Sequence, residues 1–331
     1  MKVFKVLLSL CLVFVLLAGI AVLVIFNLMK TPSGEFKEYK LSVPSGASYY
    51  SVSKDLEENG IIKNATVFYY YSRYKNAGLK SGVYTVNNTM SFDDLHTFLN
   101  TGKQEYISVS IPEGLTISTV AKMLEENGVT SASGFINICK DEAFIAKYNI
   151  PSTSLEGYLF PDTYFFTPEM QPSQVASIMV DNFYSKLATV KNAQSLNADD
   201  LHYLVKLASI VEKEYKVASE APLIASVFKN RLRYNIGLYS CATIIYIITE
   251  EQGLPHPGKV TYKDLKIESP YNTYLHAGLT PTPISNPGLV ALDAAINTPK
   301  TSYYYFRVDD EAKGTHVFTT DFDEHREAGQ N

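Results

Sequence analysis

The sequence predicts an α+β protein that is tethered to a membrane by a single N-terminal transmembrane helix. Three observations support this fold class: a long uncharged apolar run, a strand–turn–helix pattern that occurs twice, and a mainly helical second half that closes with a β-hairpin. With 331 residues, the chain is long enough for about two domains. We expect four segments, at residues 1–30, 38–105, 106–150 and 151–331.

The composition argues against several functions. The chain has 29 Lys and Arg against 34 Asp and Glu, with a formal net charge of -5 and no basic cluster, so DNA or RNA is not an expected partner. Its 24 Tyr and 17 Phe, with no Trp, leave Tyr and Phe to stack on any flat ligand. Three Cys are too few for a Cys₄ metal site or a disulfide scaffold.

The N-terminal segment, residues 1–30, is expected to be a short cytoplasmic tail followed by a transmembrane helix. The uncharged run from Val6 to Met29 exceeds the ~20 residues that a helix needs to cross a bilayer. Lys2 and Lys5 precede it, so the positive-inside rule places the N-terminus in the cytoplasm and the later residues outside. The alternative is a cleaved signal peptide, because Ala18–Ala21 loosely resembles a cleavage site.

Next comes a repeated pattern. Two pairs of segments match at a constant spacing: Val43–Gly46 with Ile111–Gly114, and Lys54–Gly60 with Lys122–Gly128. Each copy indicates a short strand, a Pro-x-Gly turn, a capping Ser48 or Thr116, and an amphipathic helix that ends at Asn-Gly. The elements expected after the two copies are helices Thr66–Lys75, Ser91–Leu99 and Ser133–Lys147 and the strand Ser81–Val86.

The strand–helix–helix–strand order of residues 38–105 resembles the LysM module, which binds glycans that contain N-acetylglucosamine. We expect residues 106–150 to be a second repeat-like segment that links to residues 151–331. The alternative is a small packing or spacer domain without a ligand.

The second half of the chain differs in composition and pattern from the first. It follows an aromatic-rich stretch, Leu155–Phe166, and its residues 255–287 are rich in loops. The helices and strands expected here are Pro172–Leu187, Asp199–Lys216, Ser219–Arg233, Pro287–Asn297 and a hairpin of Tyr303–Val308 with Thr315–Thr319.

The helix around Leu204–Glu214 carries the most informative side chains. It is apolar on nearly all sides, which predicts a buried helix with two carboxylates, Glu212 and Glu214, at its end. Burial raises a carboxyl pKa, as a general acid at neutral pH requires. The alternative is that both are ordinary glutamates where the helix reaches the surface.

Other chemistries have weaker support. The six His form no HExxH motif, and the sequence has no GxSxG elbow, Walker loop or GxGxxG after a strand. The three SxxK matches lack SDN and KTG partners. We therefore expect neither a metal nor a cofactor.

Several further motifs follow one another in the order of a known family. They are Glu156–Tyr164, Leu207–Glu214, Ala218–Glu220, Val227–Leu232, Ser269–Tyr274, Gly278–Gly288, His316–Phe318 and Glu324–His325. In these motifs the chain resembles the endolytic murein transglycosylases, the YceG-like family. The resemblance covers nearly the whole chain, which makes residues 151–331 the expected catalytic domain.

The resemblance implies a lytic transglycosylase that cleaves the β-1,4 bond from N-acetylmuramic acid to N-acetylglucosamine within nascent strands. The product ends in 1,6-anhydro-N-acetylmuramic acid, and strand elongation stops. It implies Glu212 as the catalytic residue, with Glu214 as the fallback. The implied substrate-binding residues are Ser240, Thr243, Tyr271, Asn272 and Tyr274. The implied partners are peptidoglycan strands, the membrane, and peptidoglycan synthases with other cell-wall machinery.

One segment departs from the family. Where the family usually has Gln and Asp around a Ser or Thr, this chain has Tyr239 and Cys241 around Ser240. A cysteine supplies neither the charge nor the two acceptor oxygens of an aspartate. The main alternative is therefore a catalytically weak glycan-binding or scaffold protein of the cell-wall machinery. A separate alternative keeps the enzyme but makes it a hydrolase that leaves reducing ends.

Overall fold

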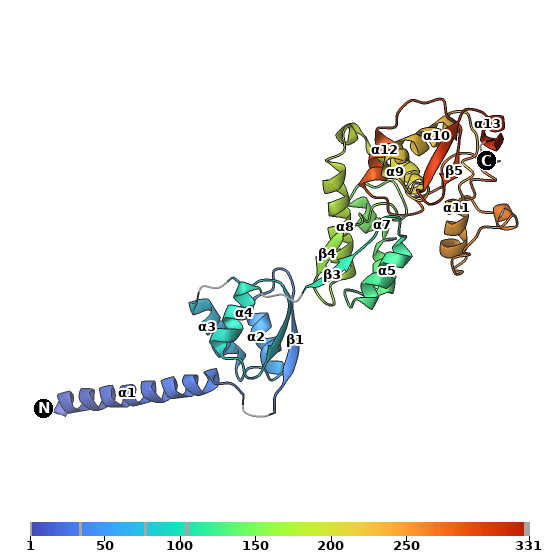
Figure 1. The fold of residues 1–331 in the computed structure, drawn as a ribbon. Helices are drawn as coiled ribbons and strands as arrows, with labels where there is room; N and C mark the ends of the chain where they lie inside the picture. The colour runs from blue at the N-terminus through green and yellow to red at the C-terminus, as the bar shows by residue number, and fades with distance from the viewer. Residues whose placement is uncertain (1, 33–34, 76–77, 103–105, 328–331) are drawn as a thin grey trace. The chain divides into compact units, whose positions relative to one another are not determined.

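The computed structural model describes residues 2–32, 35–75, 78–102 and 106–327 (Figure 1). Helices and short antiparallel strand pairs are both present, which confirms the mixed α+β character. Contacts divide the chain into two compact units, Met1–Tyr106 and Ile107–Asn331. The units are described separately below.

The chain opens with one long apolar helix, α1 (Lys2–Met29). Its stretch Leu12–Met29 has a mean hydropathy of 2.9 and is not buried in the protein. By length and composition this helix can cross a membrane, which is consistent with a membrane anchor.

The rest of the first unit has the expected strand–helix–helix–strand order. Its elements are β1 (Glu38–Val43), α2 (Tyr49–Glu58), α3 (Ala65–Tyr74), β2 (Gly82–Asn87) and α4 (Phe92–Thr101). The strands are antiparallel, with Leu41 opposite Tyr84, and both side chains are buried with Leu56 and Phe68. Ser48 accepts a hydrogen bond from the Ser51 N–H, so the predicted cap of α2 is present.

The second unit begins with the second copy of the pattern. Its elements are β3 (Ile107–Ser110), α5 (Ile117–Glu126), α6 (Ala132–Ile138), α7 (Glu142–Ala146) and β4 (Thr163–Phe166). β3 and β4 are antiparallel, with Ile107 opposite Phe166, so the aromatic-rich stretch supplies the partner strand. The single helix expected over Ser133–Lys147 is two helices, because Asp141 caps a new one by accepting from the Phe144 N–H.

A helical core follows, consisting of α8 (Pro172–Leu187), α9 (Ala198–Val211), α10 (Ala221–Arg233) and α12 (Leu289–Ile296). α9 packs against α10 and α12 (Figure 1), and Val205, Leu207, Ala208 and Ile210 are fully buried, as predicted for this helix. α9 ends at Val211 instead of continuing to Lys216, since the N–H groups of Lys213 and Glu214 bond three residues back in tighter turns.

The remaining elements are shorter. They are η1 (Ala193–Ser195), η2 (Ala218–Glu220), α11 (Cys241–Tyr246), the π-helical η3 (Ile247–Glu251), η4 (Asp264–Lys266), β5 (Tyr305–Asp310), β6 (Thr315–Thr319) and α13 (Phe322–Glu327). The C-terminal hairpin of β5 and β6 is confirmed. Hydrogen bonds from Asn230 and Arg231 on α10 to the carbonyls of Tyr303 and Tyr304 hold the start of the hairpin.

Candidate active site

The carboxylate of Glu212 lies half-buried where α9 ends. It accepts a hydrogen bond from the Gly288 N–H at 2.9 Å and longer ones from the Tyr215 hydroxyl at 3.3 and 3.4 Å. Burial raises its pKa to about 7, and the nearby Glu113 carboxylate adds to the rise, while Gly288, Tyr215 and Lys213 oppose it. Glu212 can therefore hold a proton near neutral pH.

Hydrogen bonds between α9 and the segment before α12 position the Gly288 N–H. The Ser209 hydroxyl oxygen accepts from the Ile284 N–H at 3.0 Å, and the Ser285 hydroxyl donates to the Ser209 carbonyl at 3.0 Å. Both serines are fully buried. The loop is thus attached to α9 one turn before Glu212.

The Asn286 side chain joins three distant segments. Its Oδ1 accepts from the N–H groups of Gly157 and Leu159 at 2.9 and 3.0 Å. Its Nδ2 donates to the Leu115 carbonyl at 2.9 Å and to Glu156 at 3.0 Å. Burial raises the pKa of Glu156 to about 8. The Glu156–Gly157 motif is therefore hydrogen-bonded to the loop that leads to Gly288, next to the candidate site.

The Glu214 carboxylate has different hydrogen-bond partners and neighbours from the Glu212 carboxylate. The Ser240 hydroxyl donates to its carboxylate in a short hydrogen bond. Burial raises its pKa, while Ser240, His316 and Arg231 oppose the rise. Because α9 ends at Val211, the two carboxylates are oriented by a tight turn and not by regular helical spacing.

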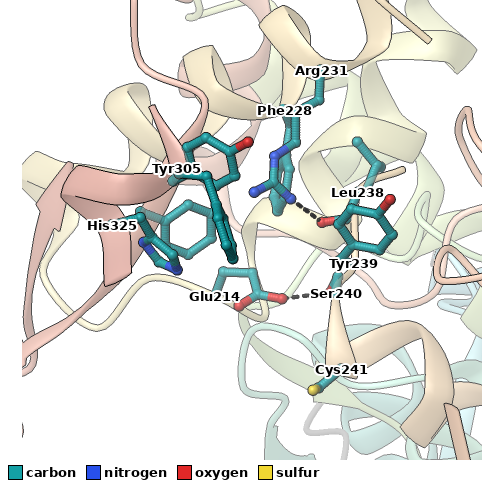
Figure 2. A pocket seen from close by; sticks show the side chains of 11 residues that line it. Glu214, Phe228, Arg231, Leu238, Tyr239, Ser240, Cys241, Tyr305 and His325 are labelled. Carbon is teal, nitrogen blue, oxygen red and sulfur yellow. Dashed lines mark hydrogen bonds between the residues drawn. The ribbon is translucent and has the colours of Figure 1, made fainter. Parts of the chain in front are cut away.

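Glu214 borders a cavity of about 440 Å³ (Figure 2). The Arg231 guanidinium lies between the rings of Tyr239 and Tyr305, 5.6 and 5.3 Å from their centroids. Tyr239 has a φ of 53°, and a Cβ on Gly237 would come within 2.8 Å of its ring. The glycine therefore allows this half-exposed tyrosine to lie where it does. The cavity wall is aromatic and carries a cation.

Three of the predicted binding residues have buried side chains. The Ser240 hydroxyl is hydrogen-bonded to Glu214, and the Ser240 N–H donates to the Thr273 hydroxyl at 3.2 Å. The Thr243 hydroxyl donates to the Ser240 carbonyl, and Asn272 Nδ2 donates to two backbone carbonyls in the preceding loop. These side chains brace α11 and the loop before it.

The two predicted tyrosines lie in the same region and are half-buried. The Tyr271 hydroxyl is 2.7 Å from that of Thr282, and its ring lies 5.0 Å from the Tyr246 ring. The Tyr274 hydroxyl is 3.1 Å from the exposed Cys241 thiol. Tyr274 and Cys241 are thus placed together with the cavity-lining residues Ser240 and Tyr239.

A second cavity, of about 220 Å³, lies on the side of Lys213 and the second repeat copy. It is lined by Thr116, Thr119, Tyr246, Glu250 and His256 among others. Glu250 accepts from the hydroxyls of Thr116 and Ser118, both at 2.9 Å. In the part of the chain that the structure describes, no group of three His, Cys, Asp or Glu side chains could hold a metal ion.

Sequence reasoning does not single out Glu113, Tyr215 and Gly288, which lie beside Glu212, or Asn286, which joins the neighbouring segments. In the sequence, Asn286 and Gly288 stand out only as parts of a family motif. Glu113 belongs to the second copy of the repeat, and the first copy has Ser45 in its place. That difference between the copies was the available signal.

Comparison with known proteins identifies relatives. The chain is 34% identical over 305 residues to the endolytic murein transglycosylase of Bacillus subtilis, covering 87% of this chain and 83% of that protein. It is 30% identical over 334 residues to the endolytic murein transglycosylase of Streptococcus pneumoniae strain D39, covering 91% of this chain but 60% of that protein.

A solved structure and a family model agree with these relatives. A YceG-like protein from Listeria monocytogenes matches with a TM-score of 0.58 and 30% identity, covering 88% of this chain and 99% of that one. The model of the YceG-like family matches residues 41–331. The chain therefore belongs to the YceG-like family.

Proposed function

We propose that this chain is an endolytic murein transglycosylase that cleaves the β-1,4 bond from N-acetylmuramic acid to N-acetylglucosamine within nascent glycan strands. Its product would end in 1,6-anhydro-N-acetylmuramic acid and so stop strand elongation. Family membership and the names of the two relatives support the activity. The observation that carries the proposal is the half-buried Glu212 carboxylate, whose pKa is raised to about 7.

Glu212 acts first as an acid and then as a base. Its proton passes to the glycosidic oxygen as the bond to the anomeric carbon of N-acetylmuramic acid breaks. The 6-hydroxyl of the same sugar then bonds to that carbon and returns its proton to Glu212. No water is consumed, and Glu212 regains its starting state. A pKa near neutrality suits both steps, because the same group must release and accept a proton.

Polar contacts keep Glu212 in place for both steps. The Gly288 N–H holds one carboxylate oxygen at 2.9 Å, and the Tyr215 hydroxyl lies near both oxygens. The sugar's own acetamido group would shield the developing positive charge. A single enzyme carboxyl group therefore suffices for the bond changes, whereas ordinary glycosidases use two.

The glycan would extend across the face that contains Tyr271, Tyr274, Tyr239 and Cys241. Their partly exposed side chains are available for stacking and hydrogen bonds. Ser240, Thr243 and Asn272 would contribute by holding this face, since their buried polar atoms bond within the protein.

The other segments would deliver the catalytic unit to its substrate. We assign residues 1–30 as the cytoplasmic tail and single span, 38–105 as a LysM-like module, 106–150 as the link, and 151–331 as the catalytic domain. The strand–helix–helix–strand order of the first unit supports the LysM-like assignment. Peptidoglycan synthases are the proposed partners, because newly made strands emerge from them.

The test is digestion of uncrosslinked peptidoglycan strands by the full-length protein in detergent, with products identified by mass spectrometry. Anhydro ends, lighter by one water than hydrolysis products, are expected. Reducing ends would show a hydrolase and contradict the proposed product. Strands that bind but stay intact would favour the scaffold alternative, for which Cys241 in place of the usual aspartate is the supporting observation.

A further inference from the structure

The turn of the second repeat copy is fixed next to the end of α9. The Ile111 N–H donates to the Asp162 carbonyl at 2.9 Å, and the Gly114 N–H donates to the Asn286 carbonyl at 2.8 Å. Lys213 Nζ donates to the Gly114 carbonyl at 3.1 Å. Gly114 has a φ of 76°, which a glycine adopts without strain. The backbone on both sides of Glu113 is therefore held.

The Glu113 carboxylate lies directly against Gly288. A Cβ on Gly288 would be 1.8 Å from Glu113 Oε1 and 2.2 Å from its Cδ, so the carboxylate fills the space that a side chain at 288 would need. The N–H of the same glycine donates to Glu212 Oε2 at 2.9 Å. Two carboxylates thus converge on one residue.

The two carboxylates interact through charge. Besides Glu113, the groups that act on Glu212 are the Lys213 ammonium, the Tyr215 hydroxyl and the Gly288 N–H. These three favour the ionised carboxylate, whereas a second negative charge nearby disfavours it. Burial is the largest cause of the raised Glu212 pKa, and Glu113, an exposed residue, is the neighbouring charge that adds to it.

We propose that Glu113 is a positioning residue of the reaction, whose carboxylate, lying against Gly288, adds to burial in disfavouring the ionised form of Glu212 in the free enzyme. This inference rests on the proposed role of Glu212 as the general acid. It also makes the second repeat copy part of the catalytic machinery and not a spacer. The first copy, with Ser45 at the matching position, shows that the turn itself does not require a carboxylate.

The test compares the pH profile of kcat/KM for full-length wild type and Glu113→Gln on uncrosslinked strands. The acid is active below the pKa of Glu212, so activity falls as pH rises through about 7. Removal of the like charge lowers that pKa, and the fall should move to lower pH by about half to one unit. That shift corresponds to a loss of about 3–10-fold in the kcat/KM of Glu113→Gln at pH 8. At pH 5 the variant and the wild type should have equal kcat/KM.

Two further variants sharpen the comparison. Glu126→Gln, on the exposed side of α5 in the same segment, removes a similar charge far from the turn's contacts and should leave the profile unchanged. Gly288→Ala is compatible with the backbone, at φ -80° and ψ 179°, but its methyl group displaces the Glu113 carboxylate. It should shift the profile in the same direction, and combining it with Glu113→Gln should add nothing.

A readout without substrate separates this inference from the proposed function. In protein labelled with ¹³C at Glu carboxyl carbons, the Glu212 resonance is identified by its loss in Glu212→Gln. Its midpoint should fall in Glu113→Gln whether or not wild type cleaves glycan. An unchanged midpoint would overturn the inference. So would a rate loss equal at all pH values, which indicates a structural role, or a raised KM without a shift, which indicates sugar binding.

Discussion

At the scale of single residues, the central question is which of two neighbouring glutamates performs the chemistry. Glu212 and Glu214 both have raised pKa values because of burial, but their partners differ. Glu212 is held by a backbone N–H and a tyrosine hydroxyl, and Glu214 by the Ser240 hydroxyl beside an arginine. The surroundings of Glu212 allow its carboxyl group to hold a proton near neutral pH, beside the loop that contains Gly288. The surroundings of Glu214 favour a structural role, in which its carboxylate supports the cavity wall.

This difference predicts unequal effects of the same substitution. Glu212→Gln should lower the cleavage rate by about 10²–10⁴-fold, because the amide can neither donate the acidic proton nor accept it back. The matched Glu214→Gln, two residues away, should retain most activity. Release of soluble glycan fragments measures both. Loss of cleavage only in Glu214→Gln would transfer the role to the fallback residue.

At the scale of secondary-structure elements, local signals in the sequence located most helices well. Pro172–Leu187 matches residue for residue, because a proline at the start and regular apolar spacing define that helix. The end of α9 was misplaced by several residues. Its last turn is set by contacts with the 284–288 loop, and sequence periodicity carries no information about them. α11 was missed because residues 241–251 give only a short apolar run.

Asn286, whose side chain links the segments at residues 115, 156–159 and 286, should contribute strongly to the stability of the fold. Asn286→Ala leaves the N–H groups of Gly157 and Leu159, the Leu115 carbonyl and the Glu156 carboxylate without this partner. We expect a loss of about 2–4 kcal/mol in the free energy of unfolding, since buried polar groups are costly to leave unpaired. Urea unfolding followed by circular dichroism measures it. An exposed asparagine, Asn127→Ala on the end of α5, is the control, and equal losses in both variants would contradict the linking role.

At the scale of the whole molecule, the described chain forms two compact units, and one apolar helix begins the first of them. Anchoring would keep the catalytic unit at the membrane surface where new strands are made. The proposed orientation, with the second unit outside, follows from the lysines before the apolar run and from the extracytoplasmic location of peptidoglycan.

The natural cysteines allow the orientation to be tested. Cys241 is exposed and Cys139 is buried. A membrane-impermeant maleimide added to intact cells should therefore label wild type at Cys241 and fail to label Cys241→Ser. Labelling only after the membrane is opened would place the second unit in the cytoplasm. The mass of the labelled chain also distinguishes a retained anchor from a cleaved signal peptide.

The sequence by itself determined the apolar span, the repeated strand–turn–helix pattern, most helix limits, the hairpin and the family. These features depend on local composition, periodicity and ordered motifs. Only the tertiary structure decided what surrounds Glu212. The turn at 112–114, the motif at 156–159 and the loop at 284–288 meet at the end of α9, although long stretches of chain separate them. Burial and backbone hydrogen bonds bring them together, and such contacts leave no periodic trace in one sequence.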